Sequence, residues 1–102
     1  MYKVFFSWDA QEDLNDIMED YDNKKLKGGL AFFAKLDTVL VLLASNPQVF
    51  AKKILHFRRA FIKKSPFVVY YQIIEKDKDV EILTILHNKR GTDFIKRKLK
   101  VK

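Results

Sequence analysis

Hydrophobic positions follow a helical period in the first half of the chain and a period of two in the second half. Residues 2–6 predict a short strand, because they are mostly β-branched and aromatic. The next residues are acidic and would form the first turn of a helix. After them, apolar residues recur every three or four positions, at Leu14, Ile17, Met18 and Tyr21. This spacing predicts an amphipathic helix whose N-terminus is capped by Ser7 or Asp9.

A second, more apolar helix is predicted from about Leu26 or Leu30 to Ala44. Its apolar side chains cover more than one side, so it should lie between the first helix and a sheet. The turn between the two helices contains Gly28-Gly29. Asn46-Pro47 ends the second helix, because proline disfavours helical backbone at the residue before it.

Beyond Pro47 the alternation predicts four strands, at residues 49–57, 59–64, 67–76 and 80–88. Ser65-Pro66 marks a break before the third of these, and residues 76–79 form a polar hairpin turn. The basic tail is expected to form a short helix whose anchors are Phe94, Ile95 and Leu99.

The order β-α-α-β-β-β-β predicts an α+β fold, in which a helical hairpin packs on one face of a mainly antiparallel sheet. The other face is expected to be free for a partner. With 102 residues the chain has room for one core. We therefore expect a single domain over residues 1–91, with residues 92–102 as its basic C-terminal tail.

Charge is distributed unevenly along the chain. Residues 1–51 hold 5 Lys and Arg against 8 Asp and Glu, a net charge of −3, whereas residues 52–102 hold 15 against 5, a net charge of +10. This asymmetry favours a basic face and an anionic partner, either nucleic acid or an acidic protein segment.

The sequence argues against export, membrane insertion and bound cofactors. It has no cysteine, which fits a reducing cytoplasm and excludes thiolate metal sites, and its apolar run over residues 30–44 is interrupted by Lys35 and Asp37. His56 and His87 have no second metal ligand at a suitable spacing. We expect a cytoplasmic protein with no metal, cofactor or membrane partner.

The remaining candidate chemistry is a basic set around the second predicted strand. On an alternating strand Arg59 and Lys63 share one face while Arg58 lies on the other, and Arg90 follows the last strand. The candidate anion-binding residues are Arg58, Arg59, Lys63, Lys64 and Arg90. Such cations bind phosphates, and they also stabilise the charge that develops when a ribose 2′-hydroxyl attacks its own phosphate. Solvated edge charge is the alternative interpretation.

Several stretches in order resemble one protein family. They are "KVFFS" near the N-terminus, a long apolar helix that ends in "NP", "PFVVYYQI", and "ILHNKR" after the last strand. Over residues 2–91 this series resembles the RelE/ParE toxins of bacterial type II toxin–antitoxin systems. The resemblance implies a small cytoplasmic toxin that forms a hetero-oligomer with a cognate antitoxin, whose acidic or amphipathic segment wraps it. RelE-like members cut mRNA on the ribosome, and ParE-like members poison DNA gyrase.

The ribonuclease residues of the family are carried over by anchoring on Tyr71-Gln72-Ile73. A central arginine then falls on Val68 and one lysine on Phe61, while a tyrosine falls on Lys96. The basic residues that match are Arg59, Lys63 and Arg90. Loss of a general acid or base costs roughly 10²–10⁴-fold in rate, so these departures favour the ParE-like side.

Three hypotheses remain open at the sequence level. The favoured one is a toxin that inhibits growth by binding an essential target, DNA gyrase, with no catalytic residues of its own. The second is a ribosome-dependent mRNA endonuclease that uses Arg59, Lys63, Arg90 and His87. The third is a non-toxic, degenerate member that acts as a DNA- or protein-binding module.

Overall fold

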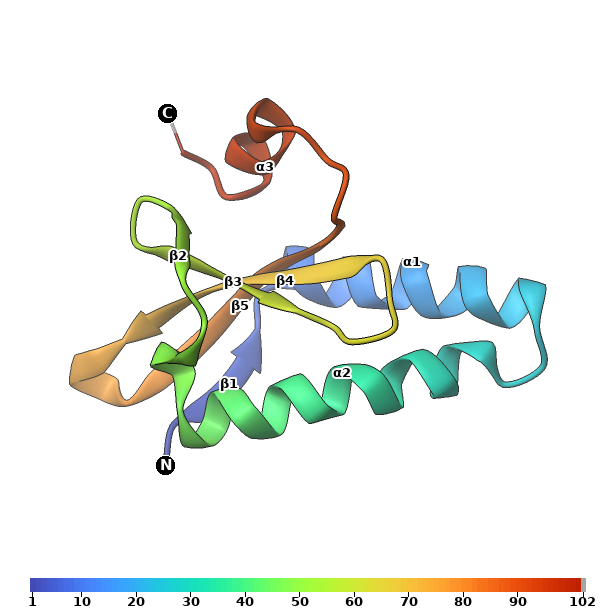
Figure 1. Cartoon of the computed structure of the whole chain (residues 1–102), viewed down its shortest axis with the longest axis horizontal. Helices are drawn as coiled ribbons and strands as arrows, with labels where there is room; N and C mark the ends of the chain where they lie inside the picture. Colours follow the sequence, from blue (N-terminus) through green and yellow to red (C-terminus); the bar gives the residue numbers. More distant parts are fainter. Residues whose placement is uncertain (102) are drawn as a thin grey trace.

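The helices and strands follow one another in the predicted type order (Figure 1). The computed structural model describes residues 1–101. The elements are β1 (Lys3–Phe6), α1 (Trp8–Lys24), α2 (Gly28–Ser45), the 3₁₀ turn η1 (Pro47–Val49), β2 (Lys52–Ile54), β3 (Phe57–Phe61), β4 (Phe67–Ile74), the 3₁₀ turn η2 (Glu75–Asp77), β5 (Asp79–His87) and α3 (Thr92–Lys98).

The five strands form one mixed sheet in the order β1-β5-β4-β3-β2. Strand β1 runs parallel to β5, and the other neighbours are antiparallel. The α1–α2 hairpin covers one face of this sheet. The α+β class and the mainly antiparallel sheet are therefore confirmed.

Ser7 caps helix α1. Its Oγ accepts a hydrogen bond from the backbone N–H of Ala10 at 3.2 Å and donates one to the carbonyl of Leu83 at 3.1 Å. Of the two candidate caps the structure selects Ser7, because this side chain satisfies a helix-end donor and also fastens the helix to the sheet.

The turn between the two helices is present, but Gly28 and Gly29, which were expected in it, are the first residues of α2. Lys27 has a positive φ of 59°, and α2 begins at Gly28. A Cβ on Gly28 would lie only 2.3 Å from the carbonyl oxygen of Tyr21, so α2 starts in direct contact with the end of α1. The stacked rings of Tyr21 and Phe32 continue this contact at 5.4 Å between centroids.

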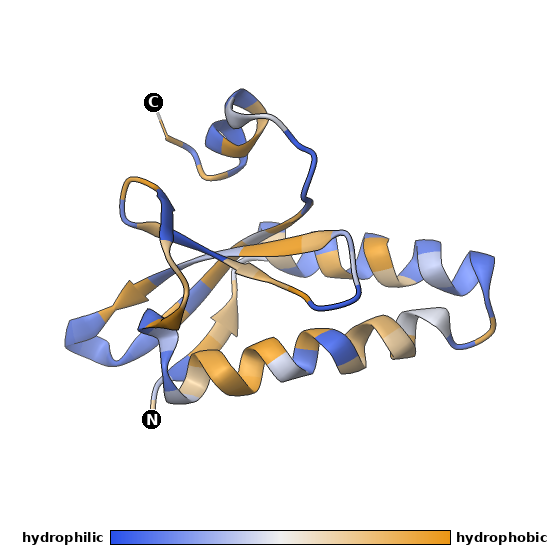
Figure 2. Ribbon diagram, viewed as in Figure 1, coloured by the Kyte–Doolittle hydropathy of each residue, from blue (hydrophilic) through white to orange (hydrophobic). Residues whose placement is uncertain are grey.

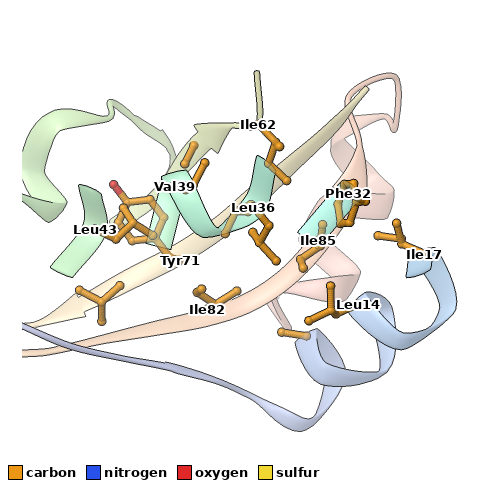
Figure 3. Close-up of a cluster of buried hydrophobic side chains, with 14 residues drawn as sticks. Leu14, Ile17, Phe32, Leu36, Val39, Leu43, Ile62, Tyr71, Ile82 and Ile85 are labelled. Atoms are coloured by element: carbon orange, nitrogen blue, oxygen red, sulfur yellow. The ribbon is translucent and has the colours of Figure 1, made fainter. Parts of the chain in front are cut away.

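The main core lies between the helical hairpin and the sheet (Figure 3). Leu36 and Leu43 of α2 are fully buried against Tyr71 and Ile82 of the sheet. The Tyr71 hydroxyl donates to the carbonyl of Pro47 at 2.6 Å. By length and composition alone α2 would pass for a membrane-spanning helix, but the buried stripe of its apolar surface belongs to this core.

The first predicted strand after Pro47 was wrong in its extent. Residues 49–57 contain the end of η1, the short strand β2 and a tight turn, after which β3 begins at Phe57. The turn forms because Leu55 adopts a left-handed conformation with φ of 52°. Residues 59–64 were also predicted as one strand, but β3 ends at Phe61 and Lys63-Lys64 lies in a turn.

The second face of the sheet is not left free, contrary to the expectation from sequence. Helix α3 lies across it (Figure 1), and Ile95 and Leu99 pack against Val68, Tyr70 and Leu86. The central strands carry apolar side chains on both faces, so both faces must be covered. The short C-terminal helix and its anchors are confirmed, with Phe94 partly buried beside the other two.

Candidate target-binding face

The first cation of the second face is the half-buried Arg59 on strand β3. Arg59 pairs with Tyr70 and Phe61 pairs with Val68, which places both side chains on the face that α3 covers. The guanidinium of Arg59 lies 4.8 Å from the centroid of the Phe61 ring. That ring is 53% exposed. A cation stacked on an exposed aromatic ring forms one amphipathic contact surface.

A second cation–aromatic group stands at the other side of this face. The guanidiniums of Arg90 and Arg97 lie 4.3 and 5.6 Å from the centroid of Phe94. Arg90 is exposed directly after β5, and Phe94 belongs to α3. Strand β4 lies between β3, which carries Arg59, and β5, which ends just before Arg90, so these two strands are two spacings apart, about 10 Å.

His87 has a packing role at the end of β5. Its ring meets Phe67 edge-on at 5.7 Å, and Nδ1 accepts a hydrogen bond from the backbone N–H of Lys89 at 3.2 Å. It lines a shallow hollow with Lys89 and Arg90. The structure therefore brings together two of the candidate ribonuclease residues, His87 and Arg90.

Arg58 lies on the opposite face from Arg59, as the alternation predicts. Its Nη1 donates to the carbonyls of Gln48 at 3.3 Å and Phe50 at 2.7 Å. These bonds hold the connection between η1 and β2. We therefore leave Arg58 out of the target-binding face described by the structure.

Lys63 and Lys64 lie in the turn after β3, beside α2. The carbonyl of Lys64 accepts a hydrogen bond from Lys35 Nζ at 3.1 Å, which ties this turn to the helix. The five candidate residues thus separate into three places rather than one patch: Arg58 under the sheet, Arg59 and Arg90 on the second face, and the two lysines next to α2.

The three departures from the ribonuclease pattern have different surroundings. Val68 is 1% exposed and packs in the cluster beneath α3. Phe61 and Lys96 are exposed, the first at the end of β3 and the second on α3. Within residues 1–101, no three His, Asp or Glu side chains come together to hold a metal ion.

Asp13 has a role that the sequence did not indicate. Its Oδ2 accepts hydrogen bonds from Thr84 Oγ1 at 2.5 Å and from the backbone N–H of Ile85 at 3.0 Å, and its Oδ1 pairs with Lys98 Nζ at 3.1 Å. Strand β1 accompanies β5 only as far as Ile82, so Asp13 occupies the open edge beyond it. The helical pattern of the sequence does not distinguish Asp13 from the exposed acids of α1, yet its side chain is only 16% exposed.

Comparisons with known structures define the class of protein. The toxin–antitoxin complex RelBE from E. coli matches at a TM-score of 0.66 and 16% identity, over 88% of this chain and 100% of that chain. The chromosomal ParDE system from P. aeruginosa matches at 0.70 and 17%, over 85% and 96%. The isolated E. coli toxin RelE matches at 0.66 and 14%, over 98% of each chain. These similarities show that the chain has the RelE/ParE toxin fold.

The family itself follows from the sequence model that the chain matches. Residues 4–91 match the family described as the ParE toxin of the type II toxin–antitoxin system parDE. The match covers most of the chain, so the chain belongs to this toxin family. The comparison with curated protein sequences gave no match.

Proposed function

We propose that this toxin arrests growth by binding DNA gyrase, and that a cognate antitoxin neutralises it. The observation that carries the non-ribonuclease half of this proposal is the burial of Val68. At the position where the resemblance puts a catalytic arginine, this chain has an apolar side chain packed beneath Ile95 and Leu99. A valine at that place supplies no charge to a phosphate transition state.

The contact surface in this proposal is the second face around its two cation–aromatic groups. Arg59 with Phe61 and Arg90 with Phe94 present apolar rings flanked by guanidiniums. Arginine and aromatic side chains are the types that dominate binding energy in protein interfaces. An acidic surface on the target would complement the net charge of +10 that residues 52–102 carry.

The antitoxin half of the proposal is supported by the relatives. Two of the similar structures are complexes of a toxin with its antitoxin, one RelBE and one ParDE. We extend this pairing to the present chain, for which the antitoxin would be an acidic partner that covers the toxin while the two are bound.

Expression of the chain alone in a bacterial host tests the target. We expect growth arrest with accumulation of cleaved DNA, and no codon-phased cuts in mRNA by primer extension. Arg59→Ala and Arg90→Ala should each weaken the arrest, since truncation of an interface arginine commonly costs more than about 1 kcal/mol. The control is Lys24→Ala, because Lys24 lies on α1, remote from this face.

Two results would decide against the proposal. Codon-phased cuts that disappear in Arg90→Ala would establish the ribosome-dependent endonuclease instead. That alternative is favoured by one observation, the shared hollow of His87 and Arg90 at the end of β5. Normal growth on expression of the intact, folded chain would show a non-toxic binding module.

A further inference from the structure

Strand β1 forms one margin of the sheet, at the opposite end from β2. Three of its four residues are apolar, and Figure 2 shows it as a largely hydrophobic strand. The N–H groups of Lys3 and Ser7 donate to carbonyls on the β5 side, at 2.9 Å each. Alternation therefore turns the N–H and C=O groups of Val4 and Phe6 to the outside, where residues 1–101 place no strand. This edge can hydrogen-bond another extended strand.

Aromatic side chains stand beside the open edge. Phe5 lies on the same face as its β5 neighbour Glu81, next to a hollow of about 390 Å³ that Trp8 and Gln11 also line. Trp8 is the single tryptophan of the chain and is 84% exposed. Tryptophan is enriched among the residues that contribute most to binding energy in protein interfaces. An exposed tryptophan beside an open strand edge therefore indicates an interaction surface.

The charges at this edge select the partner. Lys3 is exposed at the start of β1, while Glu81 lines the hollow at the end of the strand and Asp9 follows in the first turn of α1. Among the described residues no cation lines the hollow. An acidic partner would meet these carboxylates, which is unfavourable. A second copy of β1 that runs antiparallel brings its own Lys3 towards them and receives the same contact in return.

We infer that two copies of this chain associate through β1, as an antiparallel pair with Phe5 on the two-fold axis. Val4 of one copy then lies opposite Phe6 of the other, and the two pairs of this kind exchange the outward hydrogen bonds. The available edge is short, because the N–H of Tyr2 already donates to the carbonyl of Ala44 at the end of α2, at 2.8 Å. An interface of this size gives a weak dimer that depends on protein concentration.

This arrangement keeps the basic surfaces of the two copies apart. Two five-stranded sheets would join into one, with both helical hairpins on one side and both second faces on the other. Arg59 lies on β3, so its two copies stand seven strand spacings apart, about 34 Å. Their repulsion is screened, because the Debye length is about 8 Å at physiological ionic strength. Each dimer then presents two target-binding faces, and binding of the first raises the effective concentration of the second.

Cysteine cross-linking tests the register, because the chain has no cysteine of its own. At the two-fold axis the Cα atoms of a non-hydrogen-bonded pair lie about 4.5 Å apart, within the range of about 4.4–6.8 Å that a disulfide spans. Phe5→Cys should therefore form a covalent dimer under mild oxidation. Lys3→Cys is the matched control on the same strand and face. Its two copies would lie four residues apart along the pair, about 13 Å, so it should remain monomeric.

Charge reversal tests the contact between Lys3 and Glu81. Lys3→Glu and Glu81→Lys should each raise the Kd of the dimer at least about 5-fold, because like charges then meet twice in the pair. An equimolar mixture of the two variants should associate about as tightly as the parent, since opposite charges meet again at both positions. Lys25→Glu, at the far end of α1, is the control and should leave the Kd unchanged. Sedimentation equilibrium from about 10 μM to about 1 mM measures these constants.

Trp8 reports the association without a label. Its emission should move to shorter wavelength as the protein concentration rises, because the dimer removes the indole ring from water. Phe5→Glu places two carboxylates at the two-fold axis and should abolish both the dimer and this shift. Circular dichroism of each variant verifies the fold, and recovery of the dimer in the mixture shows directly that both charge variants are folded.

Four results would overturn the inference. They are a monomer throughout this concentration range, a disulfide that forms as readily in Lys3→Cys as in Phe5→Cys, a mixture that associates no better than its two components, and constant Trp8 emission in a protein that dimerises. The last two results would place a dimer contact elsewhere on the chain. Mass and emission are measured on the purified chain without its target, so this inference and the proposed function are tested separately.

Discussion

Tyr71 places a hydroxyl group in the middle of the main core. The residue is fully buried, and its hydroxyl donates to the carbonyl of Pro47. Burial raises its pKa to about 12 from an ordinary value of 10.0, and this effect outweighs the opposing influence of the nearby Arg58. The hydroxyl thus remains neutral in the folded chain and fixes η1 to the sheet.

The raised pKa of Tyr71 predicts a loss of stability in alkali. The folded state holds the proton more tightly than the unfolded state, so the stabilisation is complete below pH 10 and is lost as pH rises towards about 12. Denaturant unfolding between pH 9 and pH 12, a range chosen around these values, should show this fall. Tyr71→Phe should be less stable at neutral pH by about 1 kcal/mol and should show a smaller alkaline fall. An identical alkaline profile in both proteins would contradict the assignment.

Asp13 joins three elements through one carboxylate. Asp13→Ala should lower the free energy of unfolding by about 1–3 kcal/mol, because the N–H of Ile85 and the ammonium of Lys98 lose their acceptor in a partly buried place. Hydrogen exchange should also become faster in α3. Asp16→Ala, at an exposed position of the same helix, serves as control and should change stability by less than about 0.5 kcal/mol. Equal effects of the two substitutions would argue against a specific link.

At the scale of elements, close approach of the two long helices decides the geometry of the N-terminal half. Gly28 lies where α2 starts against the last turn of α1. The hairpin in turn covers the sheet face that includes Tyr71 and Ile82. Helix α3 covers the other face with two anchors, Ile95 and Leu99, and its Lys98 pairs with Asp13 of α1.

Alanine at two glycines separates close approach from simple flexibility. Gly28→Ala should destabilise the chain by more than about 1 kcal/mol, because the new Cβ would meet the backbone of Tyr21 at 2.3 Å. Gly91→Ala should be neutral or stabilising by up to about 1 kcal/mol, since nothing lies within 4 Å of its Cβ and its φ is −75°. Thermal unfolding of both variants measures the difference. A Gly28→Ala protein as stable as the parent would disprove the tight contact.

At the scale of the whole molecule, charge and apolar surface are concentrated in the second half of the chain and along α2. Residues 52–102 carry a net charge of +10, and two of these cations, Arg59 and Arg90, lie beside the rings of Phe61 and Phe94. A field of this sign speeds the encounter with an acidic partner.

The uneven charge predicts salt-dependent association. The rate at which the chain associates with an acidic partner should fall several-fold between low and physiological ionic strength. Stopped-flow fluorescence with a labelled polyglutamate peptide measures this rate. The dissociation rate should change much less. Charge reversal at Lys63, as Lys63→Glu, should flatten the salt dependence, whereas Lys24→Glu on α1 should reduce it less. An association rate that is independent of salt would show that electrostatic steering does not contribute.

The sequence by itself determined the type and order of the elements, the presence of a turn between the two long helices, and the opposite faces of Arg58 and Arg59, because helix and strand periods are local properties. It also indicated the anchors of the C-terminal helix. Only the tertiary structure decided which surfaces remain open: α3 folds over Val68, Asp13 caps an open strand edge, and β2 stops short of Phe61. These features depend on contacts between residues far apart in the chain. The local periodicity of hydrophobic residues carries no information about such contacts.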